Sequence, residues 1–361
     1  MDANLAVLAG DGIGPEVTAQ AVKVLQAVGA RFDHNFSFHQ APIGGVAINA
    51  CGNPYPESTH EICLKSDAVL FGAVGDLKYD SDPSAELRPE QGLLQMRKAL
   101  SLYANVRPTF VFPSLIDRSP LQRARIEKAD FIFVRELTGG IYFGEPRGRS
   151  ENGSTAFDTA VYSKGEVERL ARIGFELALK RRRKLTVVDK ANVLATSRLW
   201  RETVQNMESE YPEVSVCYEF VDAVAMRLIQ WPATYDVLIT ANLFGDILTD
   251  EASVITGSMG IMPSASLGDL VELFEPIHGS YPQAAGRDIA NPLASILSAA
   301  MLLEMAFGLK TEALAVRQAV EKSLEAGVLT ADLAVGKAPW GTAAVGDWVA
   351  REVHSPGVPL Q

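Results

Sequence analysis

Apolar residues along this chain form two patterns, short continuous runs and longer segments in which they recur with helical spacing. Continuous runs, which predict buried strands, lie at 5–9, 68–73, 131–135, 186–188 and 236–239. Segments with helical spacing, which predict helices, lie at 16–28, 93–102, 165–179, 292–307 and 311–326. Because the strands and helices alternate, the pattern predicts an α/β protein.

This alternation is interrupted between residues 107 and 159, where short strands and turns replace the helices. The chain shows neither a flexible linker nor an internal repeat. One domain inserted into another therefore explains the interruption better than two domains in tandem. We expect a large discontinuous domain at 1–103 and 257–361, and a small inserted domain at 104–256.

The composition allows two large cores, since 47% of the 361 residues are apolar. A net charge of -11 argues against nucleic acid and anionic membrane surfaces as partners. The basic cluster 180–184 follows a predicted helix and is interpreted as its solvated end. Cys51, Cys63 and Cys217 lack C-x-x-C spacing and fit free thiols in a reducing compartment. With no signal peptide or membrane-spanning run apparent, we expect a soluble cytoplasmic protein.

Two aspartates in the segment 241–250 are spaced for one face of a helix. Asp246 and Asp250 are four residues apart, so a helix that begins near Gly245 places their carboxylates on adjacent turns. Like charges repel there, and a hard divalent cation such as Mg²⁺ or Mn²⁺ turns that repulsion into binding. The alternative is one aspartate favoured by the helix dipole beside one solvated aspartate.

A glycine loop at 10–15 follows the first predicted strand and opens a helix. Its glycines superficially suggest a dinucleotide fingerprint. The fingerprint needs a glycine three residues after its second one, where this chain has Pro15. Asp33 is only loosely spaced for the acid that binds the ribose, so an ordinary Rossmann fold is not predicted.

The segment 90–97 combines two leucines with an arginine. Leu93 and Leu94 precede Arg97 by four and three residues, so one helix face carries all three. A guanidinium there binds a carboxylate while the leucines cover a branched alkyl group. The alternative is an amphipathic helix with core leucines and an exposed arginine. Arg107 follows where the chain leaves this helix.

A predicted strand pair with a turn at Thr138-Gly139 brings an arginine toward a tyrosine. With a two-residue turn there, Arg135 and Tyr142 are cross-strand neighbours. Arg135 also shares a strand face with Phe131, so we expect it to be covered and to have an anionic partner. That partner is either a ligand or a nearby structural carboxylate.

Functional groups are also expected past the strand at 186–188 and in the loop before Asn291. Lys190 lies just past the strand end, where α/β proteins commonly place functional side chains. Nearby cations favour the phenolate of Tyr142 and disfavour the ammonium of Lys190, so they lower the pKa of both groups. One site with such cations therefore makes both residues useful in proton transfer. His278 lies in a Gly/Ser/His loop and is either structural or part of a loop that wraps a nucleotide.

Together these motifs resemble the β-decarboxylating dehydrogenases, a family that includes isopropylmalate, isocitrate, homoisocitrate and tartrate dehydrogenases. The resembling blocks follow the family's order at 10–16, 90–94, 142–148, 189–192, 245–250 and 291–292. Isocitrate enzymes typically carry a serine and an asparagine in the segment 90–97, whereas Leu93 and Leu94 suit an isopropyl group. The resemblance implies the family's two-domain α/β fold, with a large mixed sheet flanked by helices, and not a Rossmann fold.

The resemblance also implies oxidative decarboxylation of 3-isopropylmalate to 2-oxoisocaproate with reduction of NAD, in leucine biosynthesis. A sister enzyme acting on malate, tartrate or homoisocitrate is the alternative. The resemblance further implies a homodimer with shared sites, to which the partner subunit contributes Asp222 and Lys190. Tyr142 protonates the enol carbon and Lys190 assists deprotonation, with Asp222 as the third catalytic residue.

The substrate and metal residues implied by the resemblance are more numerous. The substrate ligands are Arg97, Arg107, Arg135, Asp222, Leu93, Leu94 and Val193. The ligands for Mg²⁺ or Mn²⁺ are Asp222, Asp246 and Asp250. The NAD site consists of Ile13, Gly75, Glu90, His278, Gly279, Ser280, Gln283 and Asn291.

Gln283 departs from the family pattern. Many NAD-using relatives have an aspartate there that binds the adenosine ribose. Glutamine still bonds a hydroxyl but lacks the charge that repels a 2′-phosphate. The Lys-Tyr pair of NADP-dependent isocitrate enzymes is absent from Gln283-Ala284. NAD is therefore predicted, and Arg287 is the residue that argues most directly against this choice of cofactor.

Overall fold

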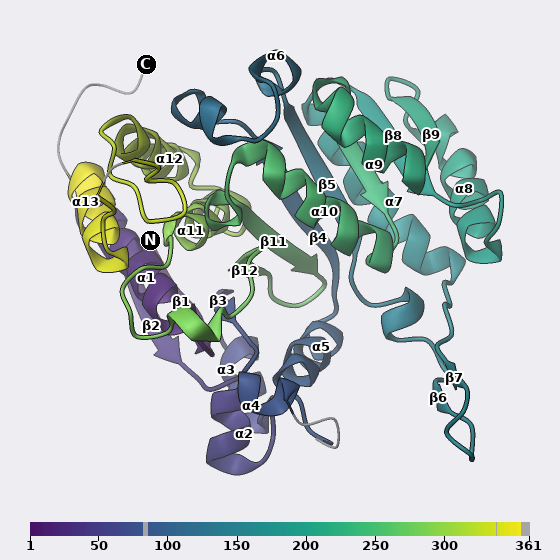
Figure 1. Cartoon of the computed structure of the whole chain (residues 1–361), viewed down its shortest axis with the longest axis horizontal. Coiled ribbons are helices and arrows are strands. Elements are labelled where there is room, and N and C mark those ends of the chain that lie inside the picture. Colours follow the sequence, from purple (N-terminus) through teal and green to yellow (C-terminus); the bar gives the residue numbers. More distant parts are fainter. Residues whose placement is uncertain (82–85, 337, 355–361) are drawn as a thin grey trace. The chain divides into compact units, whose positions relative to one another are not determined.

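The computed structural model describes residues 1–81, 86–336 and 338–354. These residues form two compact units, Met1–Leu100 with Ser258–Gln361, and Ser101–Gly257. In each unit helices flank a mixed sheet (Figure 1). The predicted α/β architecture is therefore confirmed. None of the described helices is both long enough and apolar enough to cross a membrane.

The strands of the first unit combine parallel neighbours with one antiparallel pair. Its strands follow the order β2 (Asn35–Gln40), β1 (Asp2–Gly10), β3 (Ala68–Ala73), β12 (Leu273–Pro276) and β11 (Pro263–Gly268). Neighbours are parallel except for β11 and β12. β3 is apolar and buried throughout, as is typical of a strand covered on both faces. Gly10 pairs with Ala73, so the loops after β1 and β3 leave the sheet side by side.

Eight helices accompany this sheet among the described residues. They are α1 (Gly14–Phe32), α2 (Gly45–Cys51), α3 (Glu57–Leu64), α4 (Leu77–Asp80), α5 (Pro89–Ala99), α11 (Leu293–Met305), α12 (Lys310–Glu325) and α13 (Thr342–His354), with 3-10 turns at Met259–Ile261 and Pro282–Ala284. α11 packs against α1 and α12 and is buried at every position from 293 to 303, which explains why it is apolar on all sides.

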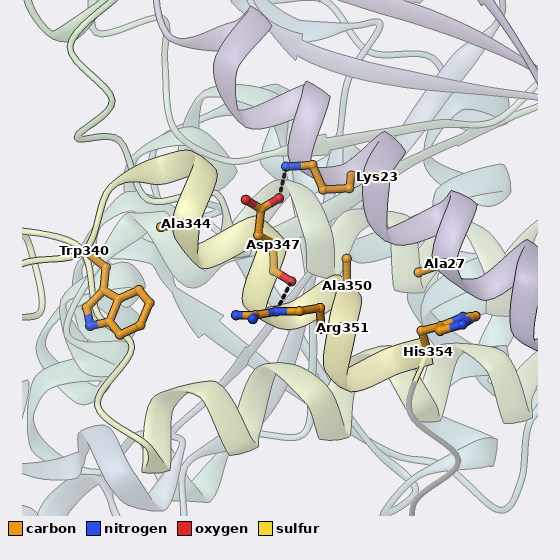
Figure 2. A pocket seen from close by; sticks show the side chains of 8 residues that line it. All are labelled: Lys23, Ala27, Trp340, Ala344, Asp347, Ala350, Arg351 and His354. Atoms are coloured by element: carbon orange, nitrogen blue, oxygen red, sulfur yellow. Dashed lines mark hydrogen bonds and ion pairs between the residues drawn. The ribbon is translucent and has the colours of Figure 1, made fainter.

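The last helix of the chain lies beside the first. Lys23 on α1 forms an ion pair with Asp347 on α13, beside a surface crevice of about 770 Å³ (Figure 2). Ala27 and Ala350 line this crevice with their small side chains. Arg351 donates a hydrogen bond to the carbonyl of Asp347 at 3.3 Å. The Lys23–Asp347 pair ties α13 to α1, and the Arg351 bond lies within α13.

The strands of the second unit are likewise mixed in direction. Its strands follow the order β4 (Leu102–Phe110), β5 (Asp130–Glu136), β10 (Val237–Thr240), β8 (Lys184–Asp189) and β9 (Ser215–Phe220). β4 and β5 are antiparallel and the other neighbours are parallel. A separate two-stranded ribbon, β6 (Gly148–Arg149) and β7 (Ala156–Phe157), extends away from this sheet (Figure 1).

The helices of the second unit enclose a core that includes Phe131, Phe133, Tyr235 and Leu238. They are α6 (Arg123–Ile126), α7 (Lys164–Lys180), α8 (Ala195–Met207), α9 (Val221–Gln230) and α10 (Asn242–Thr256), with 3-10 turns at Pro113–Arg118, Gly140–Tyr142, Glu208–Glu210 and Pro232–Thr234. Because β5, β8 and β10 are parallel, their carboxyl ends meet at one edge of the sheet, where α/β proteins commonly bind ligands.

The predicted strand pair around Thr138-Gly139 is wrong. The chain after β5 makes a 3-10 turn at Gly140–Tyr142 instead of a second strand. The carboxylate of Glu136 accepts hydrogen bonds from the backbone N–H groups of Thr138 and Gly139, at 2.7 and 2.8 Å. These bonds bend the backbone and occupy the donors of the proposed turn.

Two smaller expectations also need correction. The helix predicted at 93–102 begins at Pro89 and ends at Ala99, because Leu102 already belongs to β4. The basic cluster 180–184 is not simply a solvated helix end. Arg181 and Arg182 both donate to the buried carboxylate of Asp236, at 2.8 and 3.4 Å, so they balance a charge inside the protein.

Candidate active site

The start of α10 presents two carboxylates at the carboxyl edge of the second sheet. β10 ends at Thr240 and α10 begins at Asn242, three residues earlier than the sequence suggested. Asp246 and Asp250 lie one turn apart on this helix, with side chains that are 39% and 57% exposed. Both carboxylates are therefore open to a ligand.

Arg135, the penultimate residue of β5, lies directly beside α10. It is 3% exposed and forms an ion pair with Asp246, so the expectation of a covered arginine with an anionic partner is confirmed. A Cβ atom at Gly245 would lie 2.6 Å from Cγ of Arg135. Glycine is required at this position because the arginine stem lies directly against the helix.

Arg107 on β4 is held in a similar way. Its Nε donates to Oδ1 of Asn105 at 2.5 Å and its Nη1 donates to Oγ1 of Thr249 at 2.6 Å. Its Nη1 also lies 3.8 Å from the carboxylate of Asp250. Two neutral oxygens thus orient this buried guanidinium beside the Asp250 carboxylate.

Tyr142 lies beside Asp246 and Arg135. Its hydroxyl donates to Oδ2 of Asp246 at 2.7 Å, and its ring centroid lies 6.0 Å from Cζ of Arg135. The cross-strand geometry was wrong, but the two side chains lie close together.

The two carboxylates of α10 differ in acidity. Burial raises the pKa of Asp246, but the charge of Arg135 and the Tyr142 hydrogen bond outweigh burial and hold the pKa below its usual range. Burial raises the pKa of Asp250 above its usual range, and repulsion from Asp246 adds to this effect while Arg107 opposes it. A cation bound between them would favour the charged form of both.

Lys190 and Asp222 form a second, separate pair. Lys190 follows β8, and its Nζ donates to the carboxylate of Asp222 in the first turn of α9. This hydrogen bond lowers the pKa of Asp222. In the described part of the chain, no three His, Cys, Asp or Glu side chains gather closely enough to hold a metal ion. One chain therefore does not bring Asp222 to Asp246 and Asp250.

The first unit carries the leucines and the third arginine on α5. Arg97 is buried and donates to Oε1 of Glu275 at 3.3 Å, so the alternative of an exposed arginine is wrong. Its Nε is buried without a hydrogen-bond partner among the described residues. Leu93 and Leu94 are partly buried. In the second unit, Val193 is 62% exposed after Lys190.

Three residues predicted for the cofactor meet beside the glycine loop. A Cβ atom at Gly75 would lie 2.8 Å from Oγ of Ser280 and 3.2 Å from Oε1 of Glu90. Nearby, the backbone N–H of Ile13 donates to the carbonyl of Ser280 at 2.8 Å. The loops after β1 and β3 thus form a narrow cradle whose centre has no room for a side chain at Gly75.

A pocket of about 540 Å³ lies next to this cradle, and its volume is typical of a site for a small organic ligand. Four of the predicted cofactor residues line it: Ile13, His278, Gly279 and Asn291. Burial lowers the pKa of His278, and its Nε2 is buried without a partner among the described residues, so the imidazole is neutral. Gln283 is exposed on the adjacent 3-10 turn.

Two carboxylates of this region were missed by the sequence analysis. Asp11 is buried and accepts backbone N–H groups of Gly45, Val46 and Gly75, at 2.8, 2.8 and 3.0 Å. Its place between Gly10 and Gly12 is a sequence signal that could have been used. Asp332 accepts a hydrogen bond from Nδ2 of Asn291 at 3.0 Å and lines the pocket, but no local motif marks it.

Comparison with known proteins decides the family. The model of the isocitrate/isopropylmalate dehydrogenase family matches residues 4–349. The chain belongs to this family. The predicted resemblance to the isocitrate/isopropylmalate dehydrogenases is thus confirmed, and the chain is an oxidatively decarboxylating dehydrogenase.

Individual members of the family are similar over nearly their whole length. A 3-isopropylmalate dehydrogenase of Bacteroides fragilis is 54% identical, with 97% of this chain and 98% of the relative covered. One of Bacillus subtilis is 51% identical, with 98% of each covered. The crystal structure of isocitrate dehydrogenase from Methylococcus capsulatus superposes with a TM-score of 0.88 at 32% identity, covering 98% of this chain and 100% of that one.

Proposed function

We propose that this protein oxidises and decarboxylates 3-isopropylmalate to 2-oxoisocaproate with reduction of NAD, in leucine biosynthesis. The observation that carries the proposal is 54% identity, over 97% of the chain, to a relative named 3-isopropylmalate dehydrogenase. The free cysteines are consistent with a cytoplasmic enzyme. We further propose that the two compact units act as the two domains expected at 1–103 with 257–361 and at 104–256.

Substrate recognition is assigned to three arginines and three apolar side chains. Arg97, Arg107 and Arg135 are buried guanidinium groups that suit the two carboxylates of the substrate. The Nε of Arg97 is buried and has no hydrogen-bond partner among the described residues, which supports this role, because a buried donor without an acceptor favours an anionic ligand. Leu93 and Leu94, together with Val193, are assigned to the isopropyl group.

The carboxylates of α10 suit a divalent cation. Asp246 and Asp250 offer hard oxygen ligands on one helix face, as Mg²⁺ and Mn²⁺ prefer. A bound cation supplies Lewis-acid polarisation of the substrate oxygens. We assign the third carboxylate to Asp222 of the partner subunit.

Proton transfers are assigned to Tyr142 and Lys190. The phenol of Tyr142 lies beside the Arg135–Asp246 pair, where it is assigned to deliver a proton to the substrate carbon that loses the carboxylate. Lys190 of the partner subunit assists removal of the hydroxyl proton, and its pairing with Asp222 keeps these two residues together.

An exposed apolar face supports a homodimer with shared sites. Met226 and Ile229 on α9, Trp231 after it, and Ile247 on α10 are each about half exposed, and α9 packs against α10. Such a patch favours association with a second copy. Asp222 lies at the start of α9, so an interface built on these two helices carries it toward the partner's site.

The nicotinamide cofactor is assigned to the cradle and the pocket of the first unit. Gly75 leaves space next to Glu90 and Ser280. The neutral His278 suits the uncharged adenine ring of the cofactor. NAD supplies the hydride acceptor. We propose NAD over NADP, with the hydroxyl-binding Gln283 exposed beside the pocket.

Steady-state kinetics with 3-isopropylmalate, isocitrate, malate, tartrate and homoisocitrate, each with NAD and NADP, test the proposal. We expect the highest kcat/KM for 3-isopropylmalate with NAD, and dependence on Mg²⁺ or Mn²⁺. A higher kcat/KM for another of these acids would assign the protein to a sister activity of the family.

A further inference from the structure

Asn242, the first residue of α10, holds the guanidinium of Arg135 along one edge. Its Oδ1 accepts hydrogen bonds from Nε and Nη2 of Arg135, at 3.2 and 3.0 Å, while Nη1 of the arginine pairs with Asp246. Both Asn242 and Arg135 are buried, so water does not compete for these bonds. Because a guanidinium is planar, two bonds along one edge fix the orientation of the whole group.

Asn242 is itself fixed by two further contacts. Its Nδ2 donates to the carbonyl of Gly139 at 3.2 Å, and its backbone N–H donates to the hydroxyl oxygen of Tyr162 at 2.9 Å. The second bond satisfies one of the N–H groups that the first turn of a helix leaves open. The Tyr162 ring packs edge-on against Trp200, with centroids 5.4 Å apart. The amide therefore has little freedom to rotate.

Tyr162 also shapes the turn that carries Tyr142. A Cβ atom at Gly139 would lie 2.7 Å from the Tyr162 ring, and one at Gly140 would lie 2.4 Å from its hydroxyl. The glycine pair before Tyr142 thus makes room for Tyr162. Burial and the nearby Glu136 carboxylate raise the pKa of Tyr162, so its hydroxyl stays protonated while its oxygen accepts from Asn242.

We propose that Asn242 is a positioning residue that directs Arg135 toward a substrate carboxylate, with Tyr162 holding both Asn242 and the turn of Tyr142. The inference rests on the proposed function, because it takes Arg135 as a carboxylate ligand. An amide suits this role better than a carboxylate, since a neutral acceptor leaves the charge of Arg135 to the substrate and to Asp246.

Asn242→Ala tests this role in the full-length enzyme. Losing an acceptor from a buried charged group is expected to raise the KM for 3-isopropylmalate by about 10-fold to 100-fold, with a smaller change in kcat. The KM for NAD should stay unchanged. In an Arg135→Ala background, Asn242→Ala should raise the KM no further, because the residue acts through the arginine. Tyr162→Phe keeps the ring and should raise the same KM less.

Thr240→Val is the matched control. Thr240 is paired with Arg135 in the register of β10 and β5, and its buried hydroxyl donates to the carbonyl of Val188 at 3.1 Å. The variant therefore loses a buried hydrogen bond next to Arg135 while Asn242 and its bonds to the guanidinium stay in place. It should leave the KM for the acid unchanged. The inference is overturned if Asn242→Ala folds with an unchanged KM, if the KM values for acid and NAD rise together, or if its effect adds to that of Arg135→Ala.

Two results need separate interpretation. If Asn242→Ala does not fold, an unchanged KM in Tyr162→Phe overturns the inference by itself. If the wild-type enzyme does not oxidise 3-isopropylmalate, the proposed function fails, and the same variants are compared on the acid that it does oxidise.

Discussion

Replacing Gly245 by alanine tests whether the stem of Arg135 lies against α10. Alanine normally stabilises a helix interior relative to glycine by about 1 kcal/mol. Here its Cβ would lie 2.6 Å from Cγ and 2.8 Å from Cβ of Arg135. These atoms are close to the backbone of β5 and cannot swing aside. Overpacking of this kind costs about 1–3 kcal/mol, so we expect a net loss of up to about 2 kcal/mol and a displaced guanidinium.

Gly165→Ala provides the matched control for this substitution. Gly165 lies in the first turn of α7, where a Cβ atom would meet no other atom within 4 Å. We would compare thermal unfolding midpoints by circular dichroism, and the KM for 3-isopropylmalate. Gly245→Ala should lower the midpoint and raise the KM roughly tenfold or more, whereas Gly165→Ala should do neither. If Gly245→Ala instead gains stability and keeps its KM, the Arg135 stem does not lie where we describe it.

Three further predictions concern specificity, assembly and thiol reactivity. Leu93→Ala should lower kcat/KM for 3-isopropylmalate by about 10–200-fold while sparing malate, and equal losses on both acids would mean that the leucine supports the fold. Mixing inactive Tyr142→Phe and Lys190→Ala dimers should restore activity through hybrid sites, whereas complete subunit exchange without recovery would argue against shared sites. Burial raises the pKa of Cys63 to about 11, so at about pH 8 a thiol reagent should modify the exposed Cys51 first, and modification of native Cys63 at the same rate would contradict its burial.

The spacing of residues was sufficient to place functional side chains that lie within one helix or one strand. Asp246 and Asp250 needed only the helical period to be placed on one face, and the alternation along β5 was enough to bury Arg135. The family resemblance supplied the roles of these residues, because spacing alone left structural alternatives open for each.

Contacts between distant segments were not predictable in the same way. Asn242 meets Arg135 across 107 residues, and Asp11 meets Gly75 across 64, with no local pattern to announce either bond. The prediction of the turn after β5 was wrong for a related reason. The side chain of Glu136 captures the backbone donors of that turn, and such competition between side chain and backbone does not appear in strand propensities.

The stoichiometry of the reaction tests the central claim most directly. The purified enzyme would be given 3-isopropylmalate, NAD and Mg²⁺, and NADH would be followed by absorbance, CO₂ by trapping and 2-oxoisocaproate by mass spectrometry. The account predicts that all three products appear in equal amounts. NADH without matching CO₂ and 2-oxoisocaproate, or no NADH from this substrate, would contradict it.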